Sequence, residues 1–135
     1  MSSAGESAVV APISGLSHFQ LLVSDVEASA RWYTSVLSLV PYAQDLDIGY
    51  VALRQPAANV VLVLTTRPGG DDAATGSGAD ALDHVAFAVA DGDALRDWAA
   101  HLTALGIDHD GIVLENGRPS LQLRDPDGIA IELVA

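Results

Sequence analysis

The sequence predicts an α+β fold built from two copies of one βαβββ module. Three observations support this prediction: a length suited to one domain, an internal repeat, and the same order of strand and helix patterns in both halves. At 135 residues, half of them hydrophobic and with a mean hydropathy of +0.31, the chain can bury one core. We therefore expect one domain made of two similar halves.

The repeat is supported by rare residue types. Shifting the chain by 66 residues places His18 over His84 and Trp32 over Trp98. Residues 16–39 then show 7 identities in 24 positions, where roughly two are expected from average composition. A match that includes both tryptophans and two of the four histidines indicates a duplicated module.

The first copy opens with a strand and a helix. Apolar side chains alternate with other side chains across residues 18–23, which predicts a strand with two distinct faces. Ser24 and Glu27 have the spacing of a capping box, with Ser24 as the N-cap. Apolar residues then recur at helical spacing up to Val40, and Pro41 is expected to end the helix.

The second copy repeats this order. Asp91 is the expected N-cap of its helix and Gly106 the expected stop. Asn116-Gly117 is typical of a hairpin turn, and the segment 125–128, Asp-Pro-Asp-Gly, is typical of a type I turn. Three short strands should follow each helix, over residues 42–46, 48–54, 59–66, 111–115, 120–124 and 129–134.

We expect four segments along the chain. A loose N-terminal tail covers residues 1–12, without the basic and apolar regions of a signal peptide. The first module covers 13–67 and the second 81–135. The segment between them, 68–80, is rich in Gly and Asp and is expected to be a flexible linker.

Composition excludes several functional classes. The net charge is -12, from 18 acidic and 6 basic residues, and such an acidic chain is not suited to nucleic acid or anionic membranes. All six bases are Arg, which excludes lysine Schiff bases and P-loops, and the lack of Cys excludes disulfides and thiolate chemistry. No apolar run has the length of a membrane span. A cytoplasmic protein that acts on a small molecule is expected.

Three polar residues predict a metal site. His18, His84 and Glu132 each lie in a predicted strand on the face opposite the core residues, among mostly apolar neighbours. An apolar face with two imidazoles and one carboxylate indicates a ligand cup with a metal ion. These donors suit Fe, Mn, Ni, Co or Zn, and two His with one carboxylate are typical of non-haem Fe(II) sites. Half-buried histidines retained after duplication are the alternative.

The paired βαβββ modules, the early His in each, and the closing Asp125-Pro-Asp-Gly-Ile-Ala-Ile-Glu132 resemble the vicinal oxygen chelate superfamily. That group includes glyoxalase I, extradiol dioxygenases, methylmalonyl-CoA epimerase and bleomycin-resistance proteins. The resemblance covers residues 13–135. It implies eight strands that form a cup-shaped mixed sheet around a divalent metal ion, usually in a homodimer. The modules of one cup can come from one chain or from two.

The resemblance also separates the branches of the superfamily. Glyoxalases and epimerases usually carry a fourth ligand, Glu or Gln, where this sequence has Val63, which cannot coordinate a metal ion. The remaining set, His18, His84 and Glu132, is the one that extradiol dioxygenases use, so Fe²⁺ is favoured over Mn²⁺, Ni²⁺, Co²⁺ or Zn²⁺. The Tyr of that branch falls near Gln122, and its proton-handling His has no match.

Two functional classes remain. The favoured one is a metal-dependent, dioxygenase-like enzyme acting on a small substrate with two adjacent oxygens, with Gln122, Tyr50 and Arg54 as further catalytic or substrate-contacting residues. The alternative is a protein of the bleomycin-resistance type that binds a drug or metabolite, aromatic ones included, without catalysis.

Overall fold

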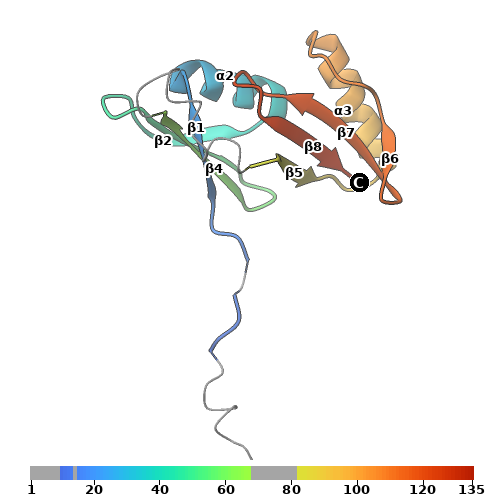
Figure 1. Cartoon of the computed structure of the whole chain (residues 1–135), viewed down its shortest axis with the longest axis horizontal. Coiled ribbons are helices and arrows are strands. Elements are labelled where there is room, and N and C mark those ends of the chain that lie inside the picture. The colour runs from blue at the N-terminus through green and yellow to red at the C-terminus, as the bar shows by residue number, and fades with distance from the viewer. Residues whose placement is uncertain (1–9, 14, 68–81) are drawn as a thin grey trace, which may run out of the picture.

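The computed structural model describes residues 10–13, 15–67 and 82–135, and these contain two βαβββ modules (Figure 1). The first comprises β1 (Phe19–Val23), α2 (Val26–Leu37), β2 (Val40–Asp45), β3 (Tyr50–Gln55) and β4 (Val60–Thr66). The second comprises β5 (His84–Ala88), α3 (Gly92–Ala104), β6 (Val113–Glu115), β7 (Arg118–Arg124) and β8 (Ala130–Val134). The predicted linker, 68–80, lies outside the described residues.

Each module forms its own four-stranded mixed sheet. The strand orders are β1-β4-β3-β2 and β5-β8-β7-β6, so the two sheets have the same topology. The first and last strands of each module pair in parallel, and the other pairs are antiparallel. The predicted α+β class and the duplicated module are therefore confirmed. Within the described residues, the eight strands hydrogen-bond as two separate sheets.

The hydrophobic core lies between each helix and its sheet, and the first module buries more of it. Leu21 and Val23 of β1 are buried, as the alternation predicts. In the second module β5 is less covered, because Val85 and Phe87 remain half-buried and its other residues are exposed. Some apolar surface on the second module is thus left uncovered within one chain.

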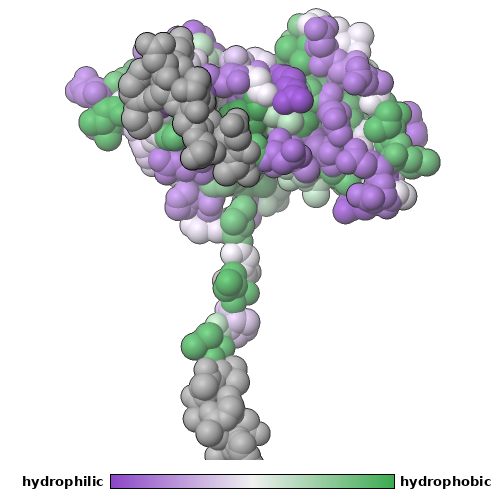
Figure 2. Space-filling model, viewed as in Figure 1, coloured by the Kyte–Doolittle hydropathy of each residue, from purple (hydrophilic) through white to green (hydrophobic). Residues whose placement is uncertain are grey.

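The described residues before β1, 10–13 and 15–18, project from the body (Figure 1). Among them, the apolar residues Val10, Ile13 and Leu16 are exposed, and Figure 2 shows apolar side chains along this segment. Among the described helices, none has both the length and the apolar character that crossing a membrane requires.

The caps of the two helices correct one prediction. Ser24 does not cap α2; the N-cap is Asp25, whose Oδ1 accepts a hydrogen bond from the backbone N of Ala28 at 3.0 Å. Ser24 instead donates its backbone N–H to Asp127 Oδ1, 3.1 Å away. Asp91 caps α3, as predicted, and it is the repeat counterpart of Asp25. Ser and Asp are both good N-cap residues, and the extended backbone conformation of Asp25 makes Asp25 the N-cap and not Ser24.

The end of α2 is a second correction. The helix stops at Leu37, because Ser38 takes a left-handed backbone conformation (φ 62°) and its N–H bonds to Thr34 O. Val40 and Pro41 therefore belong to β2, an edge strand, where a proline is tolerated. The α3 helix ends at Ala104, just before Gly106, as predicted.

Turn glycines give a first testable prediction. Gly49 has φ +68° in the turn before β3, and a Cβ there would overlap the side chain of Thr66. Gly106 has a similar φ of +72°, but a Cβ there would meet open space. Gly106→Ala should therefore cost only the left-handed strain, about 1 kcal/mol, whereas Gly49→Ala should cost clearly more. Urea denaturation of both variants checks this; equal losses would contradict it.

A polar clamp joins the two modules; it consists of Ser24, Ser29, Tyr33, Arg67, Asp125 and Asp127. Tyr33 Oη donates to Asp125 Oδ2 at 2.7 Å, and Asp125 Oδ1 accepts from the backbone N of Asp127 and of Ile129. Asp127 Oδ1 accepts from Ser24 N and lies 3.6 Å from Arg67 Nη2. Burial raises the pKa of Asp125 against the lowering effect of these donors. Burial and the charge of Asp125 also raise the pKa of the Tyr33 hydroxyl, which therefore keeps its proton.

Candidate functional site

His84 and Glu132 share the open face of the second sheet. In the parallel β5–β8 pair, His84 lies opposite Ala130 and Ala86 lies opposite Glu132. Residues of the same parity point to the same face, so His84 and Glu132 are diagonal neighbours on adjacent strands. The side most distant from the helix thus carries one imidazole and one carboxylate close together.

Glu132 is a buried carboxylate with no cationic partner among the described residues. Only 9% of the residue is exposed, and its Oε2 accepts one hydrogen bond, from Gln122 Nε2 at 3.2 Å. Arg118 and Arg124 donate to backbone carbonyls of Ala135 and Gly128 instead. Throughout the described segments no Arg or His lies within ion-pair distance of Glu132. A buried carboxylate of this kind is costly unless a cation or further donors reach it.

The imidazole of His84 is held through one nitrogen. Its Nδ1 donates to Asp83 Oδ2 at 2.7 Å, since a carboxylate can only accept, and Nε2 has no hydrogen-bond partner among the described residues. This hydrogen bond is the main reason why the pKa of His84 is raised; the charges of Glu132 and Glu115 also raise it, while desolvation opposes them. Metal-binding histidines are commonly oriented through the second nitrogen in this way.

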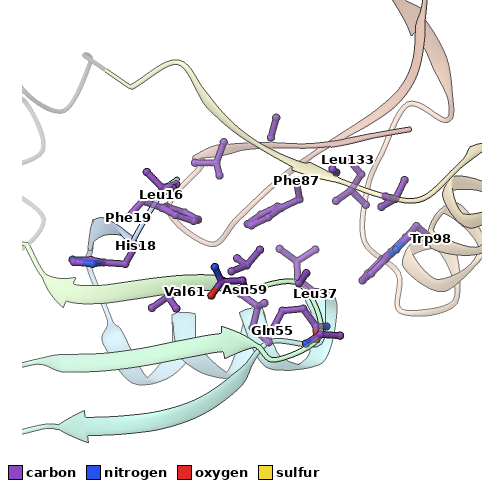
Figure 3. A pocket seen from close by; sticks show the side chains of 18 of the residues that line it. Leu16, His18, Phe19, Leu37, Gln55, Asn59, Val61, Phe87, Trp98 and Leu133 are labelled. Carbon is purple, nitrogen blue, oxygen red and sulfur yellow. The ribbon is translucent and has the colours of Figure 1, made fainter. Parts of the chain in front are cut away.

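His18 has a matching arrangement on the first module. Ser17 Oγ and His18 Nδ1 share a hydrogen bond of 3.0 Å, and Ser17 is the repeat counterpart of Asp83. The His18 ring is exposed and points away from the Phe19 ring (Figure 3). Within the described part of one chain, no three His, Cys, Asp or Glu side chains lie close enough to hold a metal ion. The strand register therefore places His84 near Glu132, and His18 does not complete a three-ligand group with them within the described part of one chain.

The strand registers locate the position of the fourth family ligand. Val63 lies opposite Gln20 in β1–β4, as Glu132 lies opposite Ala86 in β5–β8. Val63 thus occupies in the first module the place of Glu132 in the second, and it is buried. The family resemblance of the sequence also assigns the fourth ligand to Val63, in agreement with the register, and the valine side chain has no atom that could bind a metal ion.

Within the described residues, Gln122 is the one of the three further predicted residues that is hydrogen-bonded to a candidate ligand, Glu132. The Gln122 Nε2 donates to both Glu132 and Glu115, the latter at 2.9 Å. Tyr50 is half-buried on β3, opposite Thr65. The guanidinium of Arg54 lies over the Tyr42 ring, 5.3 Å from its centre. Among the described residues, neither Tyr50 nor Arg54 forms a hydrogen bond with His84 or Glu132.

Sequence reasoning missed the residues that hold the candidate ligands. Ser17 and Asp83 precede the two histidines at matched repeat positions, so the repeat itself contained the signal. Glu115 had no such signal, because its relation to Glu132 through Gln122 depends on the pairing of β6, β7 and β8.

A cavity of about 810 Å³ lies between the two modules, and His18 and His84 are among the residues that line it. Figure 3 shows Phe19 and Phe87 facing each other in it, with Trp98 at one end and Leu16 and His18 at the other. The ring centres of Phe19 and Phe87 are 5.9 Å apart. The described residues that line the cavity include no Asp, Glu, Lys or Arg.

Comparison with known proteins agrees with this architecture. The family model of the Glyoxalase/Bleomycin resistance protein/Dioxygenase superfamily matches residues 15–133. A glyoxylase/bleomycin resistance protein/dioxygenase domain from Frankia is 26% identical, with a TM-score of 0.78 over 91% of this chain and 92% of that one. Lactoylglutathione lyase from Agrobacterium tumefaciens is 22% identical (TM-score 0.74; 92% and 95% covered). The fosfomycin resistance protein FosX from Listeria monocytogenes is 18% identical (TM-score 0.68; 92% and 94%). The last two show likeness of fold alone.

Proposed function

This chain belongs to the Glyoxalase/Bleomycin resistance protein/Dioxygenase superfamily, and on that premise we propose that it is a metal-dependent enzyme acting on a small substrate with two adjacent oxygens. The observation that carries the proposal is the pairing of Glu132 with His84 on one open sheet face. The carboxylate is buried and has no cationic partner in the described residues, and the imidazole keeps Nε2 free.

The donor set fits a divalent first-row ion. His18, His84 and Glu132 would hold it, and imidazole with carboxylate suits Fe²⁺, Mn²⁺, Co²⁺, Ni²⁺ or Zn²⁺. Fe²⁺ is favoured, because two His and one carboxylate, with Val63 in the fourth place, match the facial arrangement of non-haem iron sites. A bound ion would act as a Lewis acid towards the two substrate oxygens.

The surrounding residues orient these ligands and the substrate. Asp83 and Ser17 hold the imidazoles through Nδ1, and Gln122 donates to Glu132 so that one carboxylate oxygen is held in place. Tyr50 and Arg54 lie on the open face of the first sheet, the face that carries Val63, and are proposed as substrate contacts.

We assign the cup to a homodimer in which His18 comes from the second copy. Two observations support this: three donors do not gather within the described part of one chain, and apolar side chains remain exposed on the first sheet. Leu22, Val40 and Tyr42 are each 49% exposed there. Pairing of two copies would cover apolar surface of this kind.

Val63 predicts which reaction is absent. A carboxylate at this position would serve as a base in glyoxalase-type chemistry, and valine cannot. We expect negligible isomerisation of the glutathione–methylglyoxal hemithioacetal with any metal ion. Weak, O₂-dependent ring cleavage of a catechol-like diol is expected with Fe²⁺.

Protein loaded anaerobically with Fe²⁺ or with Ni²⁺ is assayed on both substrates to check this. Robust turnover of the hemithioacetal with Ni²⁺ would overturn the assignment. No turnover in either assay, together with tight binding of a small molecule, would instead favour the binding-protein alternative.

A further inference from the structure

We propose that Arg54 binds a carboxylate on the substrate, and that it thereby selects which compounds with two adjacent oxygens the site accepts. The proposal rests on the proposed function and deepens it, because it adds a second chemical group to the substrate. It starts from the way in which this acidic chain uses its six arginines.

In the described structure, four of the six arginines are bound to groups of the protein itself. Arg67 and Arg96 form ion pairs, and Arg118 and Arg124 donate to backbone carbonyls. Arg54 has no ion pair among the described residues, although the chain has 18 acidic residues. Its guanidinium lies over the Tyr42 ring, 5.3 Å from the ring centre. A guanidinium held by a ring in this way keeps its N–H donors for an anion.

The strand registers give Arg54 a counterpart with a different role. Val63 and Glu132 are matched positions, and each lies two residues beyond the strand partner of an arginine, Arg54 in the first module and Arg124 in the second. Arg124 Nη1 donates to a backbone carbonyl of its own turn at 2.9 Å. Within the described residues Arg54 lies over Tyr42 instead. The first module thus leaves this arginine available on the open face of its sheet.

Arg54 also lies close to the place expected for the ion. It is a diagonal neighbour of Val63 across the β3–β4 pair, and such neighbours are roughly 7–8 Å apart. Val63 occupies the position of the fourth family ligand, on the same open face. The long side chain of Arg54 can therefore reach a carboxylate attached a few bonds away from the two oxygens that face the ion.

The charges around Arg54 favour a carboxylate over a phosphate. Among the described open-face residues of β1, β3 and β4, Arg54 carries the one full charge at neutral pH, and the others are Gln20, Leu22, Tyr50, Ala52, Val61, Val63 and Thr65. Asp45 shares this face but lies opposite the start of β3, and it accepts from the backbone of its own turn. A dianionic phosphate would be repelled more strongly than a carboxylate by Glu132, Glu115 and the net charge of -12. A carboxylate also matches the planar guanidinium through two parallel hydrogen bonds.

A matched pair of catechols tests the proposal. 3,4-Dihydroxybenzoate and 3,4-dihydroxybenzamide have the same shape and differ in one group, a carboxylate or an uncharged amide. Protein loaded with Zn²⁺, which supports no O₂ chemistry, is titrated with each compound by calorimetry without oxygen. We expect the benzoate to bind at least ~10-fold more tightly than the amide, because its carboxylate forms charge-assisted hydrogen bonds. Equal affinities would overturn the proposal.

Variants show whether Arg54 is the source of this preference. In Arg54→Gln, the affinity for the benzoate should fall at least ~10-fold more than the affinity for the amide. Arg54→Lys keeps the charge but loses the planar set of donors, so an intermediate preference is expected. Arg31→Gln is the control, because Arg31 is exposed on α2 and has no ion pair within the described residues. It removes the same charge and should keep the preference of the unmodified chain. An equal loss in Arg54→Gln and Arg31→Gln would show that net charge, and no contact with Arg54, is responsible.

The affinity for Zn²⁺ is measured first, so that failure of this proposal can be told apart from failure of the proposed function. If Zn²⁺ binds and the two catechols bind equally, the carboxylate site is wrong and the metal assignment is unaffected. If no Zn²⁺ binds, the proposed function fails and the two compounds are compared on the metal-free protein. A preference for the benzoate that Arg54→Gln removes would then keep the carboxylate site, and the lack of a preference would overturn it as well.

Discussion

Glu132→Gln is expected to weaken binding of a divalent ion by more than ~100-fold, because loss of a ligand should exceed the 10–100-fold effect of residues that only support ligands. The substitution keeps the shape of the side chain and the hydrogen bond from Gln122, so the loss would report on charge and coordination. Anaerobic titration with Fe²⁺, or with Co²⁺ followed by its absorption spectrum, measures the affinity.

Glu115→Gln is the matched control for this measurement. Glu115 contacts the same Gln122 amide but is not among the proposed ligands, so its substitution should cost about 10-fold or less. If the unmodified protein bound no first-row ion at micromolar concentration, or if both substitutions had the same effect, the ligand assignment would be wrong.

Mixing two defective variants tests which chain supplies His18. Neither His18→Ala nor Glu132→Gln alone should bind the ion tightly. In a mixed dimer with shared sites, one site keeps all three ligands, so tight binding should return to a fraction of the sites. If the site were formed within one chain, mixing would restore nothing.

Asp125→Ala should lower the free energy of unfolding by about 3 kcal/mol. The substitution leaves three donors without their partner: the Tyr33 hydroxyl and the backbone N–H groups of Asp127 and Ile129. Each buried donor that loses its partner costs roughly 1–3 kcal/mol, partly offset because a buried carboxylate is removed. Urea denaturation measures the change.

Two further variants make this prediction specific to the clamp. Asp108→Ala removes an exposed carboxylate and should change stability by less than about 0.5 kcal/mol. Tyr33→Phe should cost about 2 kcal/mol, and combined with Asp125→Ala it should cost less than the sum, because both remove the same hydrogen bond. Additive losses would show that Tyr33 and Asp125 act independently.

Much of the candidate site could be predicted because strand parity is local. Alternating side chains placed His84 and Glu132 on the face opposite the core, and the observed register agrees with this. Their close approach could not be predicted in the same way, because it depends on which strands pair. Whether His18 completes a three-ligand group with them also depends on how the modules pack, and within the described part of one chain it does not.

The sequence alone determined the features that depend only on residues close together in the chain. Alternation produced the strands, Asp91 capped its helix, and Asn116-Gly117 turned the hairpin with two positive φ angles. The choice of Asp25 over Ser24 as N-cap goes with the extended backbone of Asp25 and with the hydrogen bond of Ser24 N–H to Asp127 in the other module, and the helix ends at Ser38 because this residue is left-handed. Local patterns leave such neighbouring candidates nearly equal in energy, and packing decides between them.

Only the tertiary structure decided how the two copies differ. In sequence they are near repeats, yet one end of their junction is closed by Asp125 and Tyr33 and the other contains an apolar cavity. The difference arises from residues far apart in the chain, since Asp125 acts only where Tyr33 meets it across the modules. By strand register Pro56 is the counterpart of Asp125, by the repeat Ala99 is the counterpart of Tyr33, and these two side chains cannot form that hydrogen bond. Interactions of this kind depend on spatial proximity, which composition and periodicity do not contain.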